Sequence, residues 1–178
     1  MTTLSNRFEE AFSYATRLHA GQYRKDTTVP YVAHLLGVAS LVLEGGGDED
    51  QAIAALLHDA VEDQGGKATL EEIRRRFGET VAAIVEGCTD AMTIPKPPWR
   101  ERKEAYIVHL RTASAPQRLV SAADKLHNAR AILADYRALV EAFCAAGPTP
   151  LVAELERVVS EIERLASKTQ DEGDADAT

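Results

Sequence analysis

Two histidines and two aspartates are spaced along this chain in a way that suits a bound metal ion. His58 and Asp59 are adjacent and follow the apolar run Ile53–Leu57. His34 lies at the start of an earlier apolar stretch, and Asp124 lies within Ser-Ala-Ala-Asp-Lys-Leu-His-Asn. Charged side chains in apolar surroundings are costly unless they are coordinated or paired. We therefore predict one divalent metal site, for which mixed imidazole and carboxylate ligands favour Mn, Fe or Zn over Ca. The predicted ligands are His34, His58, Asp59 and Asp124. The alternative is a buried His58–Asp59 hydrogen bond without a metal.

Two further acids, Glu62 and Asp63, come four residues after His58 and Asp59 respectively. On a helix this spacing places them one turn farther along the same face. Gly65-Gly66 is expected to end that helix, and negative charge is unfavourable near a helix C-terminus. The position therefore favours a functional role for the pair. The alternative is two solvent-exposed carboxylates at a helix end.

The composition limits the class of protein. A chain of 178 residues is the size of one ordinary domain, and Cys88 and Cys144 are too few for a disulfide framework or a thiolate zinc site. The net charge of −8 argues against nucleic acid or an anionic membrane as the main partner. No segment reaches about 20 apolar residues, and the start of the chain lacks the pattern of a signal peptide. We therefore expect a soluble cytoplasmic protein.

The apolar residues recur at helical spacing along the whole chain, and no alternating strand pattern is present. Ser5 and Asp48 are the expected N-caps of two helices, and Thr69-Leu70-Glu71-Glu72 has the pattern of a capping box. The proline-rich segment Ile94–Pro98 is expected to be a loop, and the small, acidic tail Asp171–Thr178 is expected to be disordered. The fold class is therefore predicted to be all-α. The expected helices cover residues 5–18, 35–42, 48–63, 69–77, 81–87, 100–112, 117–144 and 149–167.

Four segments carry the motifs that identify a family. They are His19-Ala-Gly-Gln-Tyr-Arg-Lys, Val29-Pro-Tyr-Val-Ala-His, His58-Asp-Ala-Val-Glu-Asp and Ala123-Asp-Lys-Leu-His-Asn. In this order they resemble the HD superfamily of metal-dependent phosphohydrolases, and more specifically the hydrolase domain of RelA/SpoT-type (p)ppGpp hydrolases and their small stand-alone relatives. The resemblance implies a single helical HD domain, assigned here to residues 1–170, followed by the disordered tail 171–178. It also implies a Mn²⁺ cofactor, with Fe²⁺, Zn²⁺ or Mg²⁺ as alternatives.

The resemblance also implies an activity and the residues that carry it. The expected reaction removes pyrophosphate from guanosine 3′,5′-bis(diphosphate)-type nucleotides by means of metal-activated water. Glu62 and Asp63 are expected to orient or deprotonate that water. Arg24 and Lys25 are expected to neutralise phosphates, although spacing alone would favour a solvated basic pair. Asn128 follows Asp124 by one helical turn and is expected to contact the ribose or a phosphate.

The chain departs from the family pattern at several positions. Asp26-Thr27-Thr28 replaces a glycine-rich stretch, Leu35 replaces a proline, and Gln64 replaces a threonine. The segment Thr89–Arg102 also matches the alarmone hydrolases poorly. Two other functions therefore stay open: hydrolysis of another nucleotide or phosphorylated cofactor, and a metal-binding regulatory module with little turnover.

Several other side chains allow two interpretations. Trp99-Arg-Glu-Arg-Lys103 can form a lid over a base and its phosphates, or Trp99 can pack against a neighbouring helix. His19 and His127 are expected to be structural, and His109 to be half-buried in the core. The apolar residues of the last helix can close the core or pair with a second copy of the chain, which makes a homo-oligomer possible.

Overall fold

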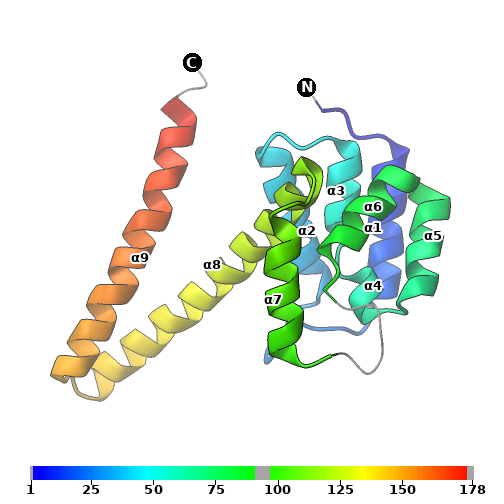
Figure 1. Cartoon of the computed structure of the whole chain (residues 1–178). Helices are drawn as coiled ribbons and strands as arrows, with labels where there is room; N and C mark the ends of the chain where they lie inside the picture. Colours follow the sequence, from blue (N-terminus) through cyan, green and yellow to red (C-terminus); the bar gives the residue numbers. More distant parts are fainter. Residues whose placement is uncertain (1, 91–96, 176–178) are drawn as a thin grey trace. The chain divides into compact units, whose positions relative to one another are not determined.

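The computed structural model describes residues 2–90 and 97–175, with side chains up to residue 164. Within these residues every regular element is a helix, apart from an isolated antiparallel bridge between Tyr23 and Pro30 (Figure 1). The predicted all-α fold class is confirmed. None of the described helices is both long enough and apolar enough to cross a membrane. The helices are α1 (Asn6–Leu18), α2 (Val32–Glu44), α3 (Glu49–Leu57), α4 (Ala60–Asp63), α5 (Lys67–Phe77), α6 (Glu79–Cys88), α7 (Trp99–Leu110), α8 (Ala115–Ala146) and α9 (Pro150–Ala175).

The chain divides into two compact units, Met1–His127 and Asn128–Thr178. The boundary between them falls inside α8, directly after His127. The first unit contains α1 to α7 and the first part of α8, and it holds all four predicted metal ligands. The second contains the rest of α8 and α9.

The core of the first unit is built around α3, which packs against α1, α2 and α6. A helix that is apolar on all sides has to be buried on all sides, and the six residues from Ala52 to Leu57 are fully buried. Asp48 begins this helix as predicted: its side chain accepts from the amide of Gln51, whose side chain accepts from the amide of Asp48 in turn. Ser5 caps α1 in the expected way by accepting from the amide of Arg7.

The prediction of a single helix over 48–63 is wrong, because α3 ends at Leu57 and α4 begins at Ala60. His58 and Asp59 form the junction. Nδ1 of His58 donates to the carbonyl of Ala55 at 2.8 Å. In an unbroken α-helix that carbonyl would accept from the amide of Asp59. The imidazole thus competes with the backbone where the helix ends, as polar side chains near helix ends commonly do.

The predicted capping box at Thr69 is also wrong. The helix α5 begins earlier, at Lys67, and Gly66 precedes it with a positive φ of 60° and no side-chain cap. Thr69 is buried, and its hydroxyl donates to the carbonyl of Gln64 at 2.8 Å. The threonine therefore stabilises the turn that leaves α4. The capping pattern does not distinguish this role from an N-cap.

In the second unit, the guanidinium of Arg137 on α8 pairs with Glu163 on α9 and donates to the hydroxyl of Ser160 at 2.9 Å. Apolar residues of both helices, including Ile132 and Leu155, line a groove of this unit. The predicted apolar face of the last helix thus has a neighbour within the chain, and pairing with a second copy stays a prediction.

The C-terminal helix and the proline loop differ in part from the expected boundaries. The helix α9 continues past residue 167 to Ala175 and so includes most of the segment predicted to be a disordered tail. Residues 176–178 lie outside the described residues, and disorder of the tail stays a prediction. Of the loop Ile94–Pro98, only Pro97 and Pro98 are described, and they precede α7 without regular structure.

Two adjacent leucines on α2 allow a matched test of this core. Leu35 is fully buried, whereas Leu36 is 43% exposed. Leu35→Ala should lower the free energy of unfolding by about 2–5 kcal/mol, because it leaves a cavity in the core. Leu36→Ala should lower it by less than about 1 kcal/mol. Urea unfolding followed by circular dichroism measures both, and equal losses would contradict this packing.

Candidate metal centre

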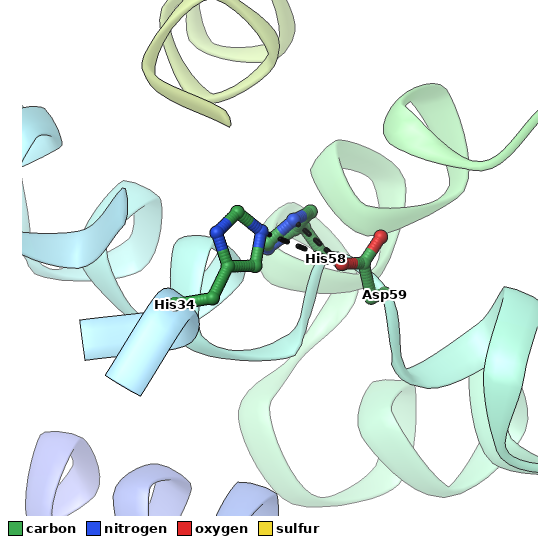
Figure 2. A group of neighbouring side chains, drawn as sticks. All are labelled: His34, His58 and Asp59. Atoms are coloured by element: carbon green, nitrogen blue, oxygen red, sulfur yellow. Dashed lines mark ion pairs between the residues drawn. The ribbon is translucent and has the colours of Figure 1, made fainter. Parts of the chain in front are cut away.

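The four predicted ligands converge on the junction between α3 and α4. Nε2 of His58 lies 3.0 Å from Oδ2 of Asp59 and 3.7 Å from Oδ1 of Asp124. Nε2 of His34, from α2, lies 3.3 Å from the same oxygen of Asp124 and 3.7 Å from Oδ2 of Asp59. Figure 2 shows His34 from α2 pointing toward His58 and Asp59, which are adjacent at the junction between α3 and α4. Their ligand atoms all lie within 4.8 Å of one another, so these three residues can bind one metal ion.

The orientation of His58 fits a metal ligand. A carbonyl oxygen can only accept, so the bond to Ala55 requires the proton on Nδ1 and leaves Nε2 for a ligand. Among the described residues, the buried Nε2 has no hydrogen-bond partner. A buried polar nitrogen without a hydrogen bond is costly. A cation between this nitrogen and the neighbouring carboxylates would satisfy all of them.

The electrostatics of the centre also suit a cation. Burial alone lowers the pKa of His58, but the negative charges of Asp59 and Asp124 outweigh burial and raise it to about 10. Burial alone raises the pKa of each aspartate. The positive charge of His58 on Asp59, and the close approach of His34 and His58 to Asp124, hold both pKa values below the usual range. The carboxylates therefore stay ionised and attract positive charge, either a proton on His58 or a metal that replaces it.

Each carboxylate has a second partner that orients it. The hydroxyl of Tyr31 donates to Oδ2 of Asp59 at 2.5 Å. Burial and the charge of Asp59 raise the pKa of Tyr31 well above its usual value, so it stays a donor. The ammonium of Lys125 pairs with Oδ2 of Asp124, which leaves Oδ1 facing the imidazoles. Partners of this kind orient metal ligands and raise their affinity for the ion.

Glu62 and Asp63 lie on α4 rather than on one continuous helix with His58, so the spacing argument for a shared face does not hold as stated. Each of the two acids has its own contacts instead. A carboxylate oxygen of Glu62 lies 3.7 Å from Nη1 of Arg102. Asp63 accepts from Nε2 of Gln22 at 3.0 Å, and its amide donates to the carbonyl of Asp59.

Arg102 and Lys103 belong to an ion-pair cluster that the sequence did not reveal. Both cations pair with Asp90, whose side chain is only 5% exposed. Burial alone raises the pKa of Asp90, but the two cations outweigh burial and lower it. Because Arg102 contacts Glu62 as well, the cluster connects the start of α7 to α4. The sequence shows only that an acid precedes the loop and two cations follow it. That order does not predict that Asp90 pairs with Arg102 and Lys103.

The predicted substrate residues belong to the two different units of the chain. Arg24 is half-buried and Lys25 is exposed in a loop where the amide of Arg24 donates to the carbonyl of Val29 at 2.8 Å. The positive charge of Arg24 acts on Tyr31, which bonds Asp59, so the loop lies on the side of the metal ligands. Asn128 is the first residue of the second unit, and its role stays a prediction.

The predictions for Trp99, His109 and His19 differ in how well they agree with the structure. Trp99 is 68% exposed, so the alternative in which it packs against a neighbouring helix is wrong; the lid stays a prediction. His109 is exposed rather than half-buried. His19 is buried, bonds Gln22 through Nδ1 and stacks on Tyr31, which agrees with a structural role.

Comparison with known proteins gives consistent matches. A protein-family model described as HD domain matches residues 11–146, more than half of the chain. The guanosine-3′,5′-bis(diphosphate) 3′-pyrophosphohydrolase MESH1 of Xenopus tropicalis is 45% identical over 124 residues, covering 68% of this chain and 66% of that protein. The guanosine-3′,5′-bis(diphosphate) 3′-pyrophosphohydrolase of Aquifex aeolicus is 39% identical over 130 residues, covering 72% of this chain and 18% of that protein.

A solved structure shows the same likeness in three dimensions. It is described as “A metazoan ortholog of SpoT hydrolyzes ppGpp and plays a role in starvation responses” and matches with a TM-score of 0.66 at 34% identity. The match covers 78% of this chain and 74% of that chain. The chain spans slightly less than two thirds of the length of the Xenopus relative.

Removal of one carboxylate tests the metal centre. Asp59→Ala should abolish metal binding, because it removes the carboxylate oxygen that faces both imidazole nitrogens. Elemental analysis after loading and gel filtration measures occupancy. The control Asp135→Ala removes an exposed carboxylate from α8 and should keep full occupancy. Full occupancy in Asp59→Ala would exclude this ligand.

Proposed function

The chain belongs to the HD-domain family, and from this premise we propose that it is a metal-dependent phosphohydrolase of guanosine 3′,5′-bis(diphosphate)-type nucleotides. The observation that carries the proposal is the convergence of two buried imidazole nitrogens on the carboxylates of Asp59 and Asp124. The descriptions of the similar proteins support the substrate class.

The proposed ligands are His34, His58, Asp59 and Asp124, and the proposed ion is Mn²⁺. Two imidazoles and two carboxylates suit Mn²⁺, and Fe²⁺, Zn²⁺ and Mg²⁺ are the alternatives. When bound, such a cation polarises a phosphoryl oxygen and lowers the pKa of a water molecule. Four protein ligands leave positions open on a six-coordinate ion, which is the mark of a catalytic rather than a structural site.

Glu62 and Asp63 are the proposed acceptors of the water proton. Hydrolysis forms a bond between the water oxygen and the phosphorus of the 3′-diphosphate and breaks the bond from that phosphorus to O3′. One proton of the water goes to a carboxylate, and O3′ takes up a proton as it leaves as a hydroxyl. Glu62 is held by Arg102 and Asp63 by Gln22, so each carboxylate is oriented before substrate binds.

Arg24, Lys25 and Asn128 are the proposed substrate contacts. Arg24 and Lys25 lie in a loop on the side of Tyr31 and Asp59. Guanidinium groups pair well with phosphate oxygens, and a chain with a net charge of −8 needs local cations to bind a polyphosphate. Asn128 would bind the ribose or a phosphate.

One alternative keeps the chemistry and changes the substrate. Asp26, which has a positive φ of 59°, puts a carboxylate next to Arg24 and Lys25 in the sequence. This negative charge partly offsets the two cations, which favours a less highly charged nucleotide or a phosphorylated cofactor. The other alternative, a regulatory module with little turnover, is disfavoured because the acid pair Glu62-Asp63 is present.

The role of Glu62 can be separated from metal binding. Glu62→Gln should lower kcat by roughly 10²–10⁴-fold if Glu62 is the general base, because the amide cannot take up the proton. The metal content should stay near that of the wild type. The control Glu9→Gln changes an exposed glutamate on α1 and should keep full activity. If Glu62→Gln loses its metal together with its activity, Glu62 belongs among the ligands instead.

The substrate is tested directly. In the presence of Mn²⁺, guanosine tetraphosphate should yield GDP and pyrophosphate, which anion-exchange chromatography separates. His58→Ala should abolish the reaction, since it removes a proposed ligand. Absent turnover, or turnover far slower than that of another nucleotide, would defeat the alarmone assignment and leave the metal phosphohydrolase standing.

A further inference from the structure

We propose that His127 is a positioning residue for the metal centre: it holds the ring of His34 through a hydrogen bond, and Gly37 is the residue that makes room for it. The inference rests on the proposed function, because it assumes that His34 is a metal ligand. It assigns to His127 a specific role in place of the general structural one expected from the sequence.

The contact joins the two rings at their Nδ1 atoms. These nitrogens are 2.9 Å apart, and the ring centroids are 4.8 Å apart at an angle of 63°. On the other side of the His34 ring, Nε2 faces Asp124 and Asp59. His127 follows Asp124 by three residues on α8, so one face of this helix supplies both a ligand and the support of another ligand.

The proton positions follow from this geometry. If Nε2 of His34 binds the ion, its proton has to be on Nδ1. That Nδ1–H then donates to Nδ1 of His127, whose own proton lies on Nε2. His34 is 1% exposed, so without His127 its Nδ1–H would lose this partner in a buried place.

Gly37 gives independent support. It lies inside α2, where glycine is less favourable than alanine because it loses more backbone freedom on folding. A Cβ at this position would lie 2.4 Å from both Cδ2 and Nε2 of His127. The ring therefore lies directly against the backbone of α2, one turn after His34. The space that the His127 ring needs therefore explains why glycine occupies this position of the helix.

The two imidazole ligands are thus supported in different ways. His58 donates through Nδ1 to the backbone carbonyl of Ala55, which no substitution removes. His34 donates to a side chain, so its support can be removed while both ligands stay in place. This difference makes the role of His127 measurable.

The test measures the dissociation constant for Mn²⁺ by calorimetry or by competition with a fluorescent chelator, without any substrate. His127→Phe keeps a ring but removes the acceptor, and it should weaken Mn²⁺ binding by about 10–100-fold. His127→Asn places a side-chain oxygen near the position of Nδ1 and should bind Mn²⁺ nearly as well as the wild type. His109→Asn, at an exposed histidine of α7, should have no effect.

A double-mutant cycle tests the role of Gly37. Gly37→Ala should weaken Mn²⁺ binding when His127 is present, because the new methyl group displaces the ring. In a His127→Ala background, Gly37→Ala should have little further effect on the dissociation constant. Additive losses would show that Gly37 acts independently of His127 and would overturn this part of the inference. The metal-free melting temperature of each variant separates loss of affinity from loss of fold.

His58→Ala distinguishes failure of this inference from failure of the proposed function. If His58→Ala binds Mn²⁺ as the wild type does, the metal centre itself is wrong. If His58→Ala loses Mn²⁺ while folded His127→Phe binds it as tightly as the wild type, the centre stands and the role of His127 is overturned. If His127→Phe does not fold, Gly37→Ala decides: binding of Mn²⁺ as tight as that of the wild type would overturn the inference.

Discussion

The structure of the first unit depends on the pairing of ionised side chains that are buried in its apolar core. The part of α3 from Ala52 to Leu57 is apolar and fully buried, and polar side chains follow directly at its C-terminal end. His58 and Asp59 occupy that end. An isolated ion there would be costly, and each one is offset by an opposite charge or a hydrogen bond from another element. His34 on α2, Tyr31 before it and Asp124 on α8 supply these partners. The same contacts that make the buried charges tolerable therefore join the helices and shape the metal site.

The hydrogen bond from His58 to the carbonyl of Ala55 has two consequences. It directs Nε2 toward the carboxylates, and it takes the carbonyl that the next turn of helix would use. The chain then starts α4, which carries Glu62 and Asp63 with separate partners, Arg102 and Gln22. The break in the helix is thus part of the site. A continuous helix would hold the acids at a fixed rotation from His58, whereas the junction lets the core and the acid pair adopt different orientations.

The sequence predicts the ligands and the helical class because both depend on local pattern. An apolar period near 3.6 and a polar pair after an apolar run are visible without any tertiary information. The end of α3 is not predictable in this way, because the residue pattern is equally compatible with a helix that continues past His58. The helix ends where the imidazole of His58 bonds the carbonyl of Ala55, and the sequence pattern does not reveal that bond. Thr69 fails for a similar reason, because its hydroxyl can cap a helix or close the preceding turn. The pairing of Arg102 with Glu62 and Asp90 joins distant segments, and only the fold brings these together.

The charges around the site favour metal binding before binding of an anionic substrate. Asp59 and Asp124 carry the negative charge closest to the imidazoles. The local cations are already engaged: Lys125 pairs with Asp124, and Arg102 and Lys103 pair with Asp90. Without a metal, the buried carboxylates would repel a polyphosphate at the distances of a direct contact. A divalent cation reverses the sign of that contact. Under the proposed function, the attraction of an anionic nucleotide to this centre would therefore depend more on the bound ion than on Arg24 and Lys25, whose proposed role would then be to select and orient the phosphates.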